Sequence, residues 1–346
     1  MSALPDQTDA VDPADELFAP LHAIDVVNLP LPLPDLAEGE PTPAAHSLQL
    51  SLIVPATNNP TTLGACLSAI RSSIDPPAEI IVIDFASGPG AAAARNKGAA
   101  LATGDILVFV DADVVVHPDA ISRLHAHLEA RPETSAVFGS YDDAPRGSGT
   151  VSGFRNLLHH HVHQGSAGIV GTFWAGLGAV RREAFEAVGG FDPDRLWLED
   201  IDLGIRLTAA GAEVVLDPSI LGTHLKVWSL PEMIRTDFHR RAVPWIDLII
   251  QHGHASTDLN LSWRHRVSAL AVLVAVFASL AFTFTAAAVA AMCFVALNFR
   301  FYRVLRRRQG LRAAVCGVFL HALHHAVSIA AVPYAIARHA RRRVNV

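Results

Sequence analysis

The sequence is poor in cysteine, and each of its ends lacks charge of one sign. Three cysteines spread over 346 residues cannot form a disulfide framework, which favours a reducing compartment. The first 46 residues contain no lysine or arginine, and no acidic residue follows Asp258. Because neither a basic segment nor an unbroken apolar stretch follows Met1, we expect no cleaved signal peptide.

The two ends of the chain therefore differ in their expected structure. Residues 1–46 carry nine acidic residues and eight prolines, a composition typical of a disordered, solvated tail. Twelve arginines follow Asp258. We expect this C-terminal region to face an anionic surface, most simply a lipid bilayer.

A long uncharged segment, Val267–Phe299, indicates a membrane domain within residues 256–346. Its 33 residues, at about 1.5 Å each, exceed a hydrocarbon core of about 30 Å, so it is one tilted helix or a hairpin of two. Leu311–Ala337 is a second candidate span. Basic segments that flank a membrane helix normally face the cytoplasm. Arg300–Arg312 and Arg338–Arg343 can both do so only if the segment between them, Leu311–Ala337, lies in the membrane interface and does not cross the bilayer. We expect two or three transmembrane or interfacial helices, and their number stays open.

Residues 47–255 alternate between short apolar segments and helical patterns. This alternation predicts βαβ units and an α/β domain with a Rossmann-like, mostly parallel sheet flanked by helices. Expected strands are Leu50–Val54, Glu79–Ile83, Ile106–Val110, Ala136–Ser140 and Val214–Leu216, and expected helices are Thr61–Ser72, Ala91–Leu101, Asp119–Ala130 and Glu199–Ala210.

Two aspartates follow the central strand of this pattern. Ile106–Val110 has the length and composition of a strand buried on both faces, and Asp111 and Asp113 come next. Alternate strand positions point to one side, so both carboxylates can project from the carboxyl end, where open α/β sheets bind ligands. Such a pair suits Mg²⁺ or Mn²⁺ carrying a diphosphate, although a lone D-x-D tripeptide also fits a solvated acidic turn.

Histidines are concentrated between His159 and His163. These two residues share a helical face at i, i+4, the spacing of a metal-binding pair, but no third ligand lies nearby in the sequence. We favour a polar helix bordering a cleft over a zinc site.

Five short motifs fall in order along the predicted α/β domain: Val54–Asn58, Asp84, Ala94–Gly98, Asp111–Asp113 and Leu198–Asp202. Each lies at a strand end or a helix start, and together they resemble the motifs of family 2 glycosyltransferases with the GT-A fold. The resemblance covers Leu48 to Trp245. The arginine-flanked apolar tail is similar to that of membrane-bound bacterial members.

The resemblance implies a role for each motif. Asp200 is expected to be the general base that deprotonates the acceptor, with inversion at the anomeric carbon, although a helix N-cap pair is also a suitable reading of Glu199 and Asp200. The cation, Mg²⁺ or Mn²⁺, is expected at Asp111, Asp113 and His224, although His224 fits a core position equally well. Contacts to the nucleotide sugar are expected from Pro55, Thr57, Asp84, Arg95, Asp111, Asp113 and Glu199.

Two features depart from the family pattern. Phe85 stands where a second acidic residue is common after Asp84, which leaves base recognition open. The segment His239–Trp245 does not match the Q-x-x-R-W motif of processive polymer synthases, which favours transfer of one sugar per encounter.

We therefore expect a membrane-anchored, inverting glycosyltransferase, multi-pass in the inner or plasma membrane, with a cytoplasmic catalytic domain. Its expected partners are a nucleotide-sugar donor and a lipid-linked acceptor, either a polyprenyl phosphate or a glycolipid, and no nucleic acid. A soluble or cell-envelope polysaccharide acceptor is an alternative. A nucleotidyltransferase would need a Gly-rich basic phosphate loop, which Thr57–Pro60 does not supply. If the protein were a non-catalytic membrane scaffold with a degenerate transferase domain, we would expect at least one motif carboxylate to be lost. Asp84, Asp113 and Asp200 are all present.

Overall fold

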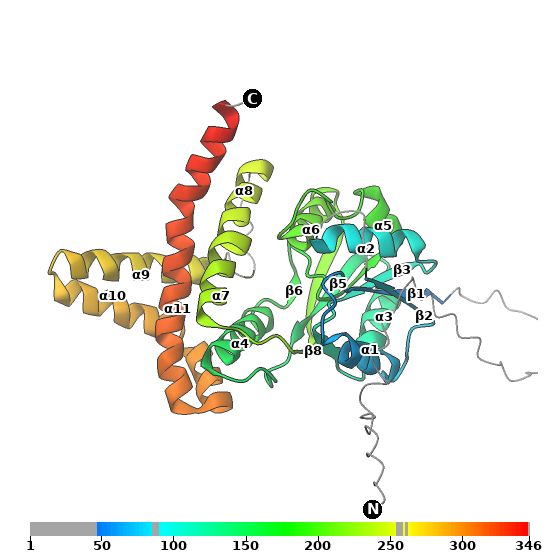
Figure 1. Cartoon of the computed structure of the whole chain (residues 1–346), viewed down its shortest axis with the longest axis horizontal. Coiled ribbons are helices and arrows are strands. Elements are labelled where there is room, and N and C mark those ends of the chain that lie inside the picture. The colour runs from blue at the N-terminus through cyan, green and yellow to red at the C-terminus, as the bar shows by residue number, and fades with distance from the viewer. Residues whose placement is uncertain (1–46, 85–89, 254–258, 260–261, 345–346) are drawn as a thin grey trace, which may run out of the picture.

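The computed structural model describes residues 47–84, 90–253, 259 and 262–344. The acidic tail expected over residues 1–46 and the departure at Phe85 lie outside these residues. An α/β domain forms one side of the molecule, and a group of C-terminal helices forms the other (Figure 1).

The strands of the α/β domain are β1 (Leu50–Pro55), β2 (Glu79–Ile83), β3 (Ile106–Val110), β4 (Val114–Val116), β5 (Thr134–Tyr141), β6 (Gly168–Ile169), β7 (Leu177–Arg181) and β8 (Glu213–His224). They form one mixed sheet in the order β2-β1-β3-β7-β5-β8-β4, with β6 paired to β8. The pairs β1–β2, β1–β3 and β5–β8 are parallel, as expected of βαβ units. The pairs β3–β7, β5–β7, β4–β8 and β6–β8 are antiparallel.

The antiparallel pairs correct the expectation of a mostly parallel sheet. They arise from β4, β6 and β7, which the sequence pattern did not reveal. β4 and β6 have only three and two residues, too few for a periodic signal. β7 has the sequence Leu-Gly-Ala-Val-Arg, which contains few large apolar side chains. It becomes a central strand because β3 pairs with one of its edges and β5 with the other.

The helices of this domain are α1 (Leu63–Arg71), α2 (Gly90–Leu101), α3 (Ala120–Ala130), α4 (Thr150–Gln164), α5 (Arg182–Ala187) and α6 (Glu199–Ala209). α1 and α3 pack on one apolar core of the sheet, and α2, α4 and α6 pack on a second. The second core continues from Phe154 of α4 into Phe301 and Leu305 of the C-terminal helices. The α/β domain and the helices therefore share a continuous apolar interior.

The C-terminal helices are α7 (Leu230–Arg235), a π-helical segment (Thr236–Ala242), α8 (Val243–His252), α9 (Trp263–Leu280), α10 (Phe284–Leu297) and α11 (Phe299–Val344). α9 and α10 form a hairpin that projects away from the α/β domain, at a large angle to α11 (Figure 1). By length and composition, α9 and the part of α11 from Phe299 to Arg341 are each candidate membrane spans.

α11 is bent at Gly310. This residue has φ 88° and ψ 177°, a backbone conformation that only glycine adopts without strain, so a short helix before it and a long one after it run in different directions. The long part packs against α4, the π-helical segment and α8 (Figure 1). Its inner face is therefore already occupied by the rest of the protein.

Candidate active site

Three parallel strands bring the first predicted site residues to one edge of the sheet. β2, β1 and β3 are neighbours, and their carboxyl ends lead into Asp84, Thr57 and Asp111 respectively. Asp84 is exposed, and Thr57 is partly exposed. Of these residues, Asp111 lines the main cleft described below, whereas Pro55, Thr57 and Asp84 are not among its lining residues.

The turn after β3 carries both aspartates to the end of β8. Its last residue leads into β4, which pairs with β8 so that Val114 lies opposite His224. This pairing places the Nε2 atom of His224 3.3 Å from the Oδ2 atom of Asp113. The ring of His224 stacks on that of Tyr141, with centroids 4.3 Å apart and an interplanar angle of 7°. His224 is therefore a buried residue that lies beside Asp113 and lines the cleft described below.

The pair formed by Asp113 and His224 fits a divalent cation. The Nδ1 atom of His224 lies 2.7 Å from the side-chain oxygen of Asn156 on α4. Because an amide oxygen only accepts hydrogen bonds, the Nδ1–H group of His224 donates to Asn156, and Nε2 is the ring nitrogen that faces the carboxylate. Burial acts to raise the pKa of Asp113, but the hydrogen bond and charge of His224 outweigh it, so the pKa is lowered. An ionised carboxylate beside a ring nitrogen of histidine is a suitable ligand pair for such an ion.

Arg95 holds the acidic residues in place. Its two terminal nitrogens lie 2.6 Å from Asp111 and 2.6 Å from Glu199, and only 4% of its side chain is exposed. Burial raises the pKa of Asp111, which Arg95 partly opposes. Arg95 and Glu199, which were expected at the nucleotide, pair with each other, and neither is among the lining residues of the main cleft. Their position suits a positioning role.

Asp200 stands at the start of α6. The preceding residue, Leu198, adopts a left-handed conformation with φ 62°, which turns the chain sharply into the helix. Gly204 lets α6 approach the segment between β6 and β7, since a Cβ atom there would lie 2.1 Å from the backbone nitrogen of Phe173. One carboxylate oxygen of Asp200 accepts a hydrogen bond from the backbone of Ile201 at 2.8 Å. Burial, followed by the charge of Glu199, raises the pKa of Asp200 to about 7. A carboxylate with this pKa is suited to accept a proton near neutral pH.

A cleft of about 330 Å³ joins these groups. Asp111, Asp113, Asp200 and His224 line one part of it. Three cationic residues and four tryptophans are also part of the lining: Arg155, Lys226, Arg241, Trp174, Trp197, Trp228 and Trp245. Arg155, Lys226 and Tyr141 were missed at the sequence level because they lie outside recognisable motifs, on elements that meet the cleft only after folding.

The histidine pair on α4 also borders this cleft. His159 and His163 lie with ring centroids 3.9 Å apart, and His159 packs against Tyr141 and Trp174. The Nδ1 atom of His163 lies 3.0 Å from the carbonyl oxygen of Gly139. Burial lowers the pKa of both rings, which keeps them neutral. This placement matches the favoured interpretation of a helix that borders a cleft.

Comparisons with known proteins agree with this geometry. The family model for glycosyl transferase family 2 matches residues 85–189. The chain is 24% identical to a pre-mycofactocin glycosyltransferase of Mycobacterium tuberculosis over 214 residues, which covers 55% of this chain and 45% of that protein. It is 32% identical to an O-antigen biosynthesis protein of Myxococcus xanthus over 143 residues, covering 36% and 11% of the two chains. The chain thus spans less than half the length of these curated relatives.

A solved structure resembles the fold over most of the chain. The mannosyltransferase of Pyrobaculum calidifontis, in complex with GDP-mannose and Mn²⁺, superposes with a TM-score of 0.53 and 17% sequence identity. The superposition covers 83% of this chain and 88% of the other. At this identity the likeness concerns the fold alone. Taken with the family match over residues 85–189 and the motifs at the sheet edge, it supports the resemblance to family 2 glycosyltransferases and a GT-A fold.

Proposed function

We propose that this protein transfers one sugar from a nucleotide-sugar donor to a lipid-linked acceptor, with inversion, at the cytoplasmic face of a membrane. The observation that carries the proposal is the cleft that unites Asp113 and His224 with Asp200, whose pKa is about 7. Nucleotide-sugar transfer needs a site for the diphosphate and a group that takes the acceptor proton. The two parts of the cleft offer one group for each task.

Each residue of the site has a distinct task in the proposed reaction. Asp113 and His224, with Asp111 beside them, would hold Mg²⁺ or Mn²⁺, which would supply Lewis-acid stabilisation of the departing nucleoside diphosphate. Arg95 fixes the direction of the Asp111 carboxylate. Asp200 accepts the proton of an acceptor hydroxyl that attacks the anomeric carbon from the face opposite the leaving group, and this displacement inverts the configuration.

A second cleft supports a lipid acceptor. It measures about 290 Å³ and lies between the π-helical segment, α8, α9 and α11. Arg241 and Trp245 line both this cleft and the main one, so the two clefts adjoin at these residues. Its remaining lining is largely apolar and includes Ile246, Ile249 and Val332. A hydrocarbon chain fits the second cleft, with its phosphate at Arg241 and its sugar in the main cleft.

The basic and acidic groups together favour one type of lipid acceptor. Arg155, Lys226 and Arg241 suit a phosphate, whereas a poised base such as Asp200 is useful only if the nucleophile has a proton to lose. A glycolipid with a phosphate and a free sugar hydroxyl would use both the basic residues and the base Asp200. A polyprenyl phosphate, whose oxygen is already ionised, would use only the first.

The α9–α10 hairpin is suited to enter a bilayer. It is uncharged from Val267 onward, and its 18-residue first helix spans about 27 Å at about 1.5 Å per residue, close to a hydrocarbon core of about 30 Å. Large apolar side chains cover its outside and tip: Leu270, Val274, Phe277, Leu280, Phe282, Phe284, Val289 and Met292.

α11 is suited to lie along the membrane surface. One face of it packs on the α/β domain, while Leu311, Val315 and Phe319, spaced at i, i+4, are exposed on another. The large angle between the hairpin and α11 allows the first to insert while the second lies flat (Figure 1). In this arrangement both basic segments, Arg300–Arg312 and Arg338–Arg343, lie on the same side of the membrane. The preference of basic segments for the cytoplasmic side is then met at both ends of Leu311–Ala337.

The direct test of the proposed function is transfer by the purified full-length protein in detergent. A panel of radiolabelled nucleotide sugars is offered with a lipid-phosphate-linked sugar, a polyprenyl phosphate or soluble sugars. We expect label in the lipid extract with the lipid-linked sugar. Efficient labelling of a soluble sugar with no lipid product would contradict the proposal.

Replacing Arg241 by glutamine is expected to lower lipid transfer at least tenfold, about the loss of one charge-assisted contact to phosphate. Donor binding and slow hydrolysis of the donor are expected to persist, because Arg241 lies toward the second cleft. The matched control is Arg235→Gln at an exposed position of α7. If donor hydrolysis fell in parallel with transfer in the Arg241 variant, its assignment to the acceptor would be wrong.

Placing charge on the hairpin is expected to weaken membrane binding. The double substitution Phe277→Asp and Phe282→Asp places two carboxylates at exposed apolar positions, each at a cost of roughly 2–3 kcal/mol inside a bilayer. We expect the variant to float poorly with liposomes that the wild type binds. Ile74→Asp, an equally apolar and exposed position on the α/β domain, is the control. Unchanged flotation of the double variant would exclude insertion of the hairpin.

A further inference from the structure

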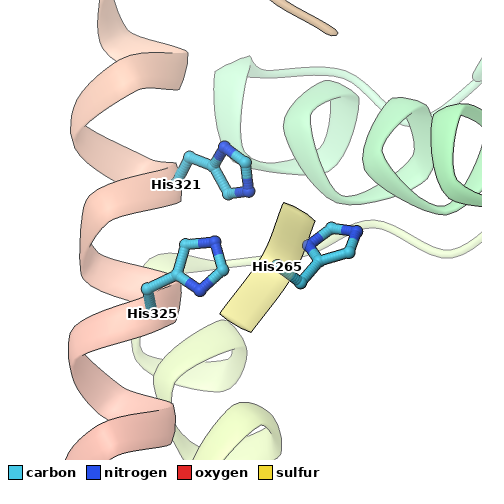
Figure 2. A group of neighbouring side chains, drawn as sticks. All are labelled: His265, His321 and His325. Atoms are coloured by element: carbon cyan, nitrogen blue, oxygen red, sulfur yellow. The ribbon is translucent and has the colours of Figure 1, made fainter. Parts of the chain in front are cut away.

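Three buried histidines meet at the base of the α9–α10 hairpin, outside the cleft that holds Asp113 and Asp200. His265 lies in the first turn of α9, and His321 and His325 lie one turn apart on α11. Their exposed fractions are 6%, 1% and 5%. One ring nitrogen from each residue lies within 4.8 Å of the other two. Figure 2 shows the rings of His321 and His325 on the side of α11 that faces the start of α9.

These rings have nitrogens without partners. The Nε2 atoms of His265, His321 and His325 are all buried, and none has a hydrogen-bond partner among the described residues. Leaving a polar atom buried and unpaired is unfavourable, and three such atoms in one place call for an explanation. The Nδ1 atom of His321 lies 3.2 Å from the hydroxyl of Tyr302, which orients the ring and directs its Nε2 atom away.

We propose that His265, His321 and His325 bind one divalent transition-metal ion of the zinc class. Two histidines at i, i+4 on a helix with a third from another element form a recurrent three-imidazole site. Tetrahedral Zn–N bonds of about 2.0–2.1 Å place nitrogens about 3.4 Å apart, so small ring rotations close the present separations. An ion bound by these three residues would link α9 to α11.

The surroundings of the histidines suit such an ion. The ring of Phe294 on α10 lies 5.3 Å from that of His321 and 5.8 Å from that of His325, which shields this side from water. On the other side, His265 and His325 line the second cleft. A water molecule from that cleft can serve as the fourth ligand.

The site differs in ligand chemistry from the donor site. Three imidazoles favour Zn²⁺, Co²⁺ or Ni²⁺, whereas the carboxylates near Asp113 suit Mg²⁺ or Mn²⁺. The two sites can therefore be emptied and filled separately, and the inference stands apart from the proposed transfer reaction.

The test is metal binding by the purified full-length protein in detergent. The protein is stripped with chelator, incubated with Zn²⁺, passed through a desalting column and analysed for metal. About one equivalent is expected in the wild type, and less than about one tenth in His321→Ala and in His325→Gln. His239→Ala, at an exposed histidine of the π-helical segment, and Asp113→Asn are expected to keep about one equivalent. Filling with Co²⁺ is expected to give the visible absorption of a four-coordinate nitrogen site.

A second readout covers variants that fold poorly. Zn²⁺ is expected to raise the Tm of the stripped wild type by a few degrees and to leave that of His325→Gln unchanged, because only a ligand held by the folded state stabilises it. Failure of the wild type to retain Zn²⁺, or equal retention by the wild type and both histidine variants, would overturn the proposal. Loss of metal from His239→Ala as well would show surface binding and overturn it too.

Discussion

Replacing Asp200 with asparagine is expected to lower transfer by about 10² or more while donor binding persists. The scale is that of a positioned general base, and the amide keeps the shape of the carboxylate but cannot take a proton. Turnover and donor affinity are measured separately, with Asp194→Asn at an exposed position as the control. Equal losses in affinity and rate would instead identify Asp200 as a structural helix cap.

The pH dependence of transfer tests the role of Asp200 as the general base independently. Burial raises the pKa of Asp200 from 3.8 to about 7, so the base is ionised only above neutral pH. Transfer by the wild type is expected to rise as pH increases through about 7, and residual transfer by Asp200→Asn is expected to lack this rise. A wild-type profile that is flat from acidic to alkaline pH would contradict the role.

The stability of the protein is expected to respond in the opposite direction. Between pH 3.8 and about 7 the carboxyl of Asp200 is ionised in the unfolded chain but protonated in the folded one. The folded state therefore binds the extra proton, and this contribution to stability declines as pH rises through that window. The Tm of Asp200→Asn relative to wild type is expected to increase over the same range and to level off above it.

The Asp200 variant also separates the two lipid acceptors. Attack by a sugar hydroxyl requires loss of a proton, whereas a phosphate oxygen is already ionised. If the acceptor is a lipid-linked sugar, Asp200→Asn loses transfer by the full factor. A small loss with polyprenyl phosphate as acceptor would shift the assignment to that substrate.

Replacing Asp113 with asparagine is expected to remove metal-dependent donor binding, with a loss of affinity of about 10² or more. The change takes a charged oxygen ligand from the cation and leaves the imidazole of His224 as its remaining close partner. Donor affinity is measured with Mg²⁺, with Mn²⁺ and with chelator. Wild type is expected to lose affinity in chelator, and the variant to be nearly insensitive to it.

The control for this change is Asp119→Asn. Asp119 lies on the same stretch of chain and pairs with Arg123 at 2.6 Å, at the start of α3 and outside the cleft. It is expected to bind donor as the wild type does. Full activity of the Asp113 variant in the presence of chelator would exclude the metal role.

The order of β1, β2, β3, β5 and β8 and of α1, α2, α3 and α6 could be predicted from the sequence alone, whereas β4, β6 and β7 could not. Residues 79–83 and 106–110 form strands with the expected bounds, because short, strongly apolar segments ending in polar residues have few other stable conformations. The sequence also determined that Asp111, Asp113 and Asp200 reach one site, since strand ends and helix starts of α/β units meet at one edge of the sheet.

Which of these side chains contact one another depends on the packing of the whole domain. Asp113 and His224 are far apart in sequence and meet because the short strand β4 pairs with β8, and no local pattern encodes that register. Arg95 was assigned to the nucleotide from its motif, but packing commits it to Asp111 and Glu199. The group formed by His265, His321 and His325 depends on the hairpin and on the bend at Gly310, which bring distant helical faces together. Local composition determines each element, whereas contacts between elements depend on burial that becomes available only when the whole chain has packed.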